Sequence, residues 1–160
     1  MDENNNEKGA EARRMVEEYL RVRHARVTAE RLAMAEAICS IDGHFSIEDL
    51  SSLLTERKFR VSLATLYNNL QLMVEAGVAT CHTFGTHLLY ECALGVPPHF
   101  HCICKDCGKV IGFTDARLLT HVQKARVKGF KPDYARIYFY GLCTQCRALR
   151  TRKANKLLKK

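Results

Sequence analysis

Two Cys-x-x-Cys motifs set the strongest constraint on how this chain can fold. Cys104 and Cys107 form the first motif, and Cys143 and Cys146 form the second. Zinc favours four thiolate ligands in a tetrahedron, and two such turns supply them with little strain. A redox-active Cys-x-x-Cys is the alternative, but it does not normally occur as a matched pair. The motifs therefore predict a structural zinc (Zn2+) site that leaves no position for a substrate.

Charge and cysteine usage narrow the class of protein. The net charge is +8 and the pI is near 9.2, which favours a polyanionic partner such as nucleic acid over an anionic membrane surface. A basic but inert surface is the alternative. No apolar run is long enough to span a bilayer, and the polar, acidic first residues are unlike a secretory signal. Eight cysteines without an export signal predict a reducing compartment, the cytoplasm.

The first half of the chain has the pattern of a helical domain that ends in a hairpin. Residues 1–9 are polar and are predicted to be disordered, and residues 10–93 are predicted to form a winged helix-turn-helix domain. The predicted elements are a helix over residues 10–24, helices capped by Thr28, Ser46 and Ser62, and strands over residues 78–83 and 88–92.

The helix that follows Ser62 has two different faces. Its leucines share one side, and Ala64, Tyr67, Asn68 and Gln71 share the opposite side. In a winged helix-turn-helix domain this second face is the one offered to the major groove of DNA. The alternative is an ordinary amphipathic helix whose polar side is solvated.

A second unit follows a short linker. Residues 94–98 contain Pro97-Pro98, which ends regular structure, and residues 99–147 carry both cysteine motifs. Strands are predicted over residues 110–113 and 135–140, with a helix between them that starts at Thr114 and ends at Gly129. Residues 148–160 are predicted to be a basic tail that is solvated or touches nucleic acid. The predicted fold class is α+β, with a winged helix-turn-helix domain followed by a small α/β domain that holds the four-cysteine zinc site.

A His-x-His motif directly precedes the first cysteine motif. In an extended segment His99 and His101 project to the same side, because strand side chains alternate. Two imidazoles on one face form half of a second metal site, or else they are ordinary polar side chains exposed to solvent. The spacing alone leaves both readings open.

Several motifs together resemble the ferric uptake regulator family of bacterial metal-dependent repressors. They are Val27-Thr28-x-x-Arg31, His44-Phe45-Ser46-x-Glu48-Asp49-Leu50, Leu63-Ala64-Thr65-Leu66-Tyr67, His99-x-His101, Cys104-x-x-Cys107-Gly108-Lys109-Val110-Ile111 and Tyr138-x-Tyr140-Gly141-x-Cys143. The resemblance spans residues 12 to 147. It implies a homodimer that binds double-stranded DNA at a palindromic, AT-rich operator, with residues 99–147 as the dimerisation domain.

The resemblance also implies a regulatory metal site at the junction of the two domains. Carried over by position, its ligands are His44, Glu91, His99 and His101. Imidazole and carboxylate donors suit Fe2+, Mn2+ or Zn2+. The resemblance further implies that DNA is bound by residues at two helix starts and on the helix after Ser62, which here are Arg26, Thr28, Arg31, Ala64, Thr65, Tyr67, Asn68 and Gln71.

The chain departs from the family pattern at three places. A further metal site of many members is lost, since its positions hold side chains that cannot ligate: Pro98, Phe100, Leu119 and Ala135. Peroxide-sensing relatives carry an acidic ligand where this chain has Gly112. Asn68 stands where relatives usually have arginine, which removes one charge from the DNA face.

The sequence therefore predicts a metal-responsive, DNA-binding transcription regulator, most simply a repressor of metal-homeostasis genes, and not an enzyme. A redox- or haem-responsive regulator acting through Cys102 is the alternative on the same scaffold. A zinc hydrolase or deaminase is a remote alternative, because the His-x-Glu and Pro-Cys-x-x-Cys motifs of zinc deaminases are absent.

Overall fold

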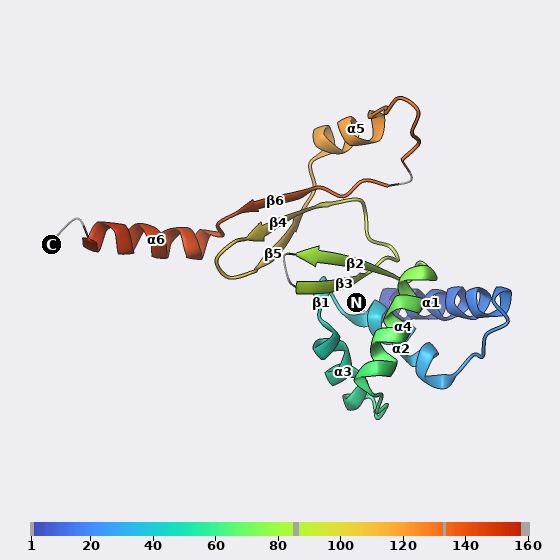
Figure 1. Ribbon diagram of the computed structural model, residues 1–160. Coiled ribbons are helices and arrows are strands. Elements are labelled where there is room, and N and C mark those ends of the chain that lie inside the picture. The colour runs from blue at the N-terminus through green and yellow to red at the C-terminus, as the bar shows by residue number, and fades with distance from the viewer. Residues whose placement is uncertain (1, 85–86, 133, 158–160) are drawn as a thin grey trace. The chain divides into compact units, whose positions relative to one another are not determined.

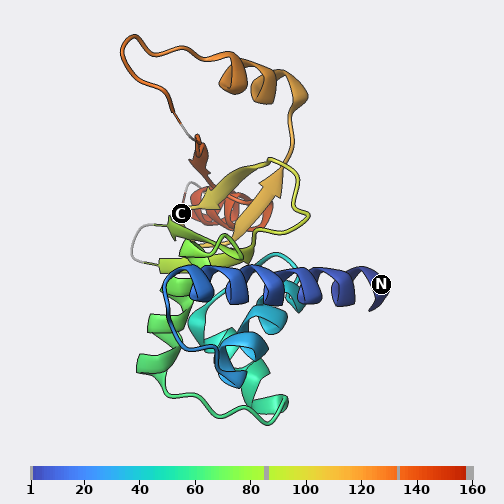
Figure 2. The same cartoon turned by 90° about the vertical axis from the view of Figure 1, so that its right-hand side faces the viewer.

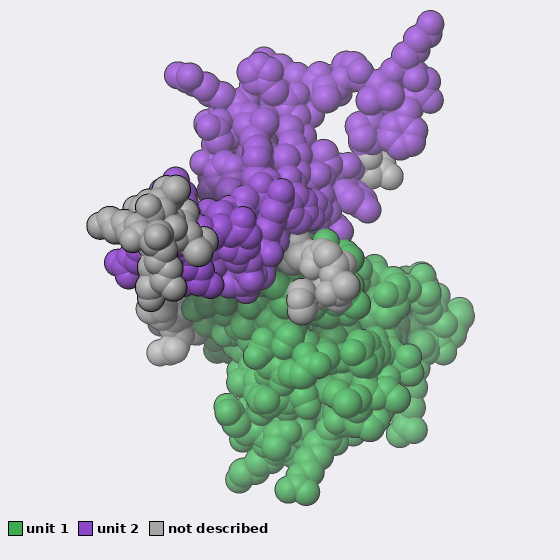
Figure 3. Space-filling view, turned by 60° about the vertical axis from the view of Figure 1, so that its left-hand side comes forward, with its two compact units in different colours: residues 1–96 green, residues 97–160 purple. Residues whose placement is uncertain are grey.

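The computed structural model describes residues 2–84, 87–132 and 134–157, and it divides into two compact units. Unit 1 comprises residues 1–96 and unit 2 comprises residues 97–160, coloured separately in Figure 3. The division falls between Val96 and Pro97, inside the predicted linker. Among the described residues, every helix is too short or too polar to cross a bilayer.

Unit 1 has the helices and the sheet of a winged helix-turn-helix domain, as predicted (Figure 1). Its sheet has the order β1-β3-β2 and is antiparallel throughout. The short strand β1 joins the edge of the β2–β3 hairpin, and the sequence pattern did not predict it. The elements are α1 (Asp2–Val22), α2 (Ala29–Ser40), β1 (His44–Phe45), α3 (Ile47–Glu56), α4 (Leu63–Glu75), β2 (Ala79–Phe84) and β3 (His87–Cys92).

Side-chain caps fix the starts of three helices. Thr28, Ser46 and Ser62 each accept a hydrogen bond from the backbone N–H three residues further on. Asp49 accepts a bond from the Ser46 backbone N–H at 2.8 Å, which completes a capping box. These three starts agree with the sequence prediction.

Unit 1 has a continuous apolar core, to which every helix of the unit contributes. Figure 2 shows α1 running the length of the unit beside the shorter helices. Burial of large side chains of this kind stabilises a fold by about 1.5–3 kcal/mol each. The largest fully buried side chains are Phe45, Leu20, Met34, Ile38, Leu50, Leu54, Leu66, Leu70, Met73, Val16 and Val78.

The prediction of disorder for residues 1–9 is wrong for the part that the structure describes. Helix α1 begins at Asp2, and Gly9 is buried against Glu36 of α2, which a Cβ added at Gly9 would approach to 3.6 Å. Extending an existing helix costs much less than nucleating a new one, so a polar segment can continue a helix that is anchored further along. The polar composition of this segment therefore indicates contact with solvent, but it does not indicate that the segment lacks helical structure.

Unit 2 is built on a small mixed sheet of order β5-β4-β6. Strand β4 pairs antiparallel with β5 and parallel with β6, so it occupies the centre. The elements are β4 (Phe100–Cys104), β5 (Val110–Phe113), α5 (Ala116–Lys124), β6 (Tyr138–Gly141) and α6 (Thr144–Leu157).

Two predictions for unit 2 need correction. Helix α5 is capped by Asp115, whose carboxylate accepts the Leu118 N–H at 2.8 Å, rather than by Thr114, and it ends at Lys124 rather than at Gly129. Strand β6 starts at Tyr138, later than predicted. The basic tail is exposed over residues 148–153, as predicted, and it lies in helix α6, from which the Arg150 guanidinium donates to the Asp106 carboxylate of the β4–β5 turn at 2.8 Å.

Candidate metal centres

The four motif cysteines meet at one end of the unit 2 sheet. Cys104 ends β4, Cys107 lies in the following turn, and Cys143 and Cys146 lie at the start of α6. Because β4 and β6 are parallel and Cys104 pairs with Gly141, both motifs emerge at the same edge. The four cysteine sulfurs all lie within 4.8 Å of one another. We call these residues the four-cysteine cluster.

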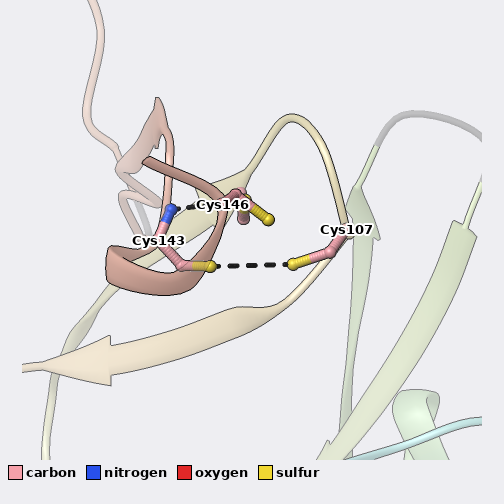
Figure 4. A group of neighbouring side chains, drawn as sticks. Cys107, Cys143 and Cys146 are labelled. Carbon is pink, nitrogen blue, oxygen red and sulfur yellow. Dashed lines mark hydrogen bonds between the residues drawn. The ribbon is translucent and has the colours of Figure 1, made fainter. Parts of the chain in front are cut away.

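Hydrogen bonds link the sulfurs of the four-cysteine cluster and shift the pKa values of Cys104 and Cys146 in opposite directions. The Cys107 and Cys143 sulfurs are 3.8 Å apart and face each other across the cluster (Figure 4). The backbone N–H of Cys143 donates to the Cys104 sulfur at 3.3 Å, and this bond, together with further backbone hydrogen bonds from Cys107 and Asp106, lowers the pKa of Cys104 to about 6. Hydrogen bonds to Cys107 and Cys143 raise the pKa of Cys146. A divalent cation would replace these shared protons, as thiolate coordination requires.

The donor set fits zinc. Four sulfurs within tetrahedral reach match a structural zinc site, in which no coordination position remains for a substrate or water. Both cysteine motifs therefore belong to one site, as the sequence predicts. When bound, the ion would fasten the β4–β5 turn to the start of α6.

A second group of polar side chains lies on one face of the unit 1 sheet. His44 and Glu91 are directly paired in the β1–β3 register, and His44 Nε2 lies 3.5 Å from Glu91 Oε2. His82 Nε2 lies 2.8 Å from Glu91 Oε1, and both His82 and Glu91 are buried. The Glu91 carboxylate is therefore shared between two imidazoles.

Sequence reasoning gave no role to His82. Its partner in β3 is Leu89, two residues before Glu91, so His82 and Glu91 are diagonal neighbours on the same face of the hairpin. Once the hairpin register is known, strand alternation identifies the pair. The His82 ring holds one carboxylate oxygen and thereby orients the other toward His44, which is the usual role of an outer-shell partner at a metal site.

His99 and His101 form a close pair in unit 2. Their ring centroids are 4.5 Å apart, as expected for side chains on one side of an extended segment. His99 Nδ1 lies 3.0 Å from the Pro97 carbonyl, which accepts from it, so the lone pair of this imidazole is at Nε2. His101 is buried in the central strand β4. Both rings are positioned as nitrogen donors.

Gly112 borders this histidine pair. It pairs with His101 in the β4–β5 register, and a Cβ added to it would lie 3.3 Å from His99 Cδ2. A carboxylate side chain at this position would lie beside His99. Glycine instead leaves space for the ring.

The candidate DNA-binding residues lie on and around α4. Ala64, Thr65, Tyr67, Asn68 and Gln71 are all exposed, and Tyr67 retains 51% of its surface. The opposite face of α4 is buried in the core through Leu66, Leu70 and Met73, as the sequence pattern predicts, but Leu63, which was expected on that face, is 57% exposed. A groove of about 500 Å³ runs beside the helix start and is lined by Arg26, Thr28, Glu30, Arg31, Arg60, Val61, Ser62, Thr65 and Asn69.

Arg31 also has a structural role that the sequence did not reveal. Its Nε donates to Asn69 Oδ1 at 3.2 Å, and its Nη1 donates to the Arg26 carbonyl. These bonds connect the start of α2 with α4. Arg26 is exposed in the same groove, which makes it the more accessible cation of the two.

Comparisons with known proteins agree with the arrangement of elements and cysteines. The model of the ferric uptake regulator family matches residues 23–140. The chain is 32% identical to the peroxide operon regulator of Bacillus subtilis over 130 residues, covering 81% of this chain and 89% of that protein. It is 35% identical to the ferric uptake regulation protein of Escherichia coli K12 over 123 residues, covering 75% of this chain and 82% of that protein.

Solved structures show the same fold. The ferric uptake regulator from Pseudomonas aeruginosa with manganese is 32% identical, with a TM-score of 0.66, and the match covers 78% of this chain and 95% of that one. The Helicobacter pylori ferric uptake regulator is 19% identical with a TM-score of 0.72, and the match covers 87% of this chain and 93% of that one, which supports the fold alone.

Proposed function

The chain belongs to the ferric uptake regulator family of metal-dependent transcription regulators, and we propose that it represses transcription as a DNA-binding homodimer when a divalent ion is bound. The proposed regulatory ligands are His44, Glu91, His99 and His101, which we call the interdomain ligand set. Known relatives are regulators rather than enzymes, so a hydrolase or deaminase activity is not supported. A cytoplasmic location is part of the proposal.

The distribution of donors between the two units carries this proposal. Unit 1 offers one imidazole and one carboxylate, from His44 and Glu91, and unit 2 offers the imidazoles of His99 and His101. Two protein donors fill at most half of the coordination sphere of a zinc, iron or manganese ion, which takes four or more ligands. An ion that uses all four donors therefore links the two units and favours one arrangement of them.

By linking the two units, the ion can change the affinity of the protein for DNA. A ligand can shift a conformational equilibrium only by its difference in affinity for the two states, and about 5.5 kcal/mol would make a complete switch. A few kcal/mol of preference for the DNA-competent arrangement is enough for regulation. Zn2+ would be favoured by affinity, so the availability of Fe2+ and Mn2+ decides which ion acts in the cell.

The surface of unit 2 supports a homodimer. Several large apolar side chains of this unit are exposed to solvent in a single copy of the chain. Exposed apolar side chains that lie together commonly mark a surface that binds another protein. These side chains are Ile111, Val127, Phe130, Tyr134, Phe139 and Tyr140. A second copy that covers them would also space two α4 helices for the two halves of a palindromic operator.

We place α4 in the major groove, with its exposed face toward the bases. Tyr67 offers an apolar ring edge for thymine methyl groups, and Asn68 offers an amide that can pair with adenine. Arg26 and Arg60 in the adjacent groove would contact phosphates. An AT-rich operator is consistent with these side chains.

DNA binding with and without metal tests the proposed function. A duplex recovered by selection from random-sequence DNA serves as the probe, with fluorescence anisotropy as the readout and manganese(II) or zinc(II) as the added ion. We expect removal of the exchangeable ion to weaken binding by the wild-type protein roughly 5- to 150-fold. His99→Ala should bind weakly under both conditions.

His121→Ala provides the matched control, because His121 is an exposed imidazole of the same unit on α5. It should bind the duplex as the wild type does. Equal, metal-independent binding by wild type and His99→Ala would overturn the proposed switch.

A further inference from the structure

Two buried cysteines outside the four-cysteine cluster lie unusually close together. Cys39 lies near the end of α2, Cys92 ends β3, and their sulfurs are 2.7 Å apart. Their exposed fractions are 4% and 6%. Although 53 residues separate them in the chain, both belong to unit 1, where α2 packs against β3. Sequence analysis alone would class both thiols as small core residues.

This separation is close to bonding distance. A disulfide has a sulfur–sulfur length of about 2.05 Å, so the two atoms need to approach by only about 0.65 Å from 2.7 Å. The Cys107–Cys143 pair at 3.8 Å is also close, but it belongs to the four-cysteine cluster, where a metal ion would hold both sulfurs. Cys39 and Cys92 are therefore the thiol pair best placed to be oxidised.

We propose that Cys39 and Cys92 form a reversible disulfide when the protein meets a hydroperoxide. One thiol attacks the peroxide oxygen, which breaks the O–O bond, gives a sulfenic acid and releases an alcohol, or water in the case of hydrogen peroxide. The second thiol attacks the sulfenic sulfur, forms the S–S bond and expels water. The thiols lose two electrons and two protons, and the peroxide receives them.

Burial determines which oxidant can act. The small exposed fractions of both thiols exclude a bulky disulfide such as oxidised glutathione, so the proposed oxidant is a molecule of the size of hydrogen peroxide. In a reducing compartment such a bond forms transiently and serves as a signal rather than as a permanent crosslink. Formation of this disulfide does not require the proposed metal switch.

The disulfide would constrain the part of unit 1 that holds the proposed DNA-binding helix and a proposed metal ligand. It closes a chain segment that contains α3, α4 and β2, so the helix proposed to bind DNA lies within the loop. Cys92 directly follows Glu91 in β3. Restricting this segment stabilises unit 1, mainly by reducing the freedom of the unfolded chain.

Peptide mapping of the intact, zinc-loaded protein tests the proposal. The protein is treated with hydrogen peroxide, or in parallel with oxidised glutathione, then denatured, alkylated and digested without reductant. We expect a linked pair of peptides containing Cys39 and Cys92 after peroxide treatment only. Its mass should be lower than the sum of the free peptides by two hydrogen atoms, and dithiothreitol should reverse the link.

The controls separate this pair from the other thiols. Zinc content is measured in the same samples and should stay constant, Cys81→Ser should still form the link, and Cys92→Ala should not. Complete alkylation of both Cys39 and Cys92 while zinc is retained would overturn the proposal. Loss of zinc before any link forms, or a link from either residue to a cluster cysteine, would overturn it as well, because the cluster would then be the reactive site.

Discussion

Replacement of Cys104 by serine is expected to release the structural zinc and to unfold unit 2. Among the described residues of this unit, the buried apolar side chains are Phe100, Ile103 and Cys104 alone, too few for an independent core. Structural zinc contributes an apparent binding free energy of about 10–16 kcal/mol. This is comparable to the whole stability of a typical domain, about 5–15 kcal/mol.

Three readouts check this prediction. Elemental analysis should show one zinc fewer per chain than in the wild type, circular dichroism should show lost secondary structure, and sedimentation should show a shift from dimer to monomer. Cys102→Ser is the matched control, because Cys102 lies on the same strand two residues from Cys104 but outside the cluster. A folded, dimeric Cys104→Ser protein that lacks zinc would show that unit 2 does not need the ion.

Replacement of Glu91 by glutamine is expected to abolish tight binding of the exchangeable ion. The carboxylate is the only charged donor of the interdomain ligand set, and its two oxygens lie 3.5 Å from His44 and 2.8 Å from His82. Loss of an outer-shell partner typically costs 10- to 100-fold in metal affinity. Loss of a charged ligand should therefore cost at least roughly 100-fold.

The fold should survive this change. Glutamine keeps the length of the side chain and a carbonyl oxygen that can accept from His82, so the free energy of unfolding should change by at most about 1–3 kcal/mol. Glu56→Gln, at an exposed carboxylate that ends α3 in the same unit, should bind metal as the wild type does. Isothermal titration with manganese(II) measures the affinity, and wild-type affinity in Glu91→Gln would remove this residue from the ligand set.

Local signals made much of unit 1 predictable from the sequence. A serine or threonine directly before an apolar run predicts a helix start. The caps at Thr28, Ser46 and Ser62 were predicted in this way, and all three lie where they were expected. The division of α4 into a buried and an exposed face follows from helical periodicity in the same way. The sequence also predicted that the two cysteine motifs lie close together, because a structural zinc ion needs four ligands and each motif supplies two.

Features that depend on contacts between distant segments were not predictable. The polar start of α1 is helical because it continues a helix anchored on α2, and α6 is held by the Arg150–Asp106 ion pair across 44 residues. The His82–Glu91 bond requires the hairpin register, and the approach of Cys39 to Cys92 requires the packing of α2 on β3. No local pattern encodes any of these contacts.

A cobalt(II) titration of the zinc-loaded protein, read by visible absorbance, tests most directly whether one ion joins the two units. His44→Ala removes a donor from unit 1, and His99→Ala removes a donor from unit 2. The account predicts one tightly bound, exchangeable cobalt per wild-type chain and none in either variant. If either variant keeps an exchangeable cobalt at wild-type affinity, the ion is held within a single unit, and metal-controlled DNA binding through the interdomain ligand set is contradicted.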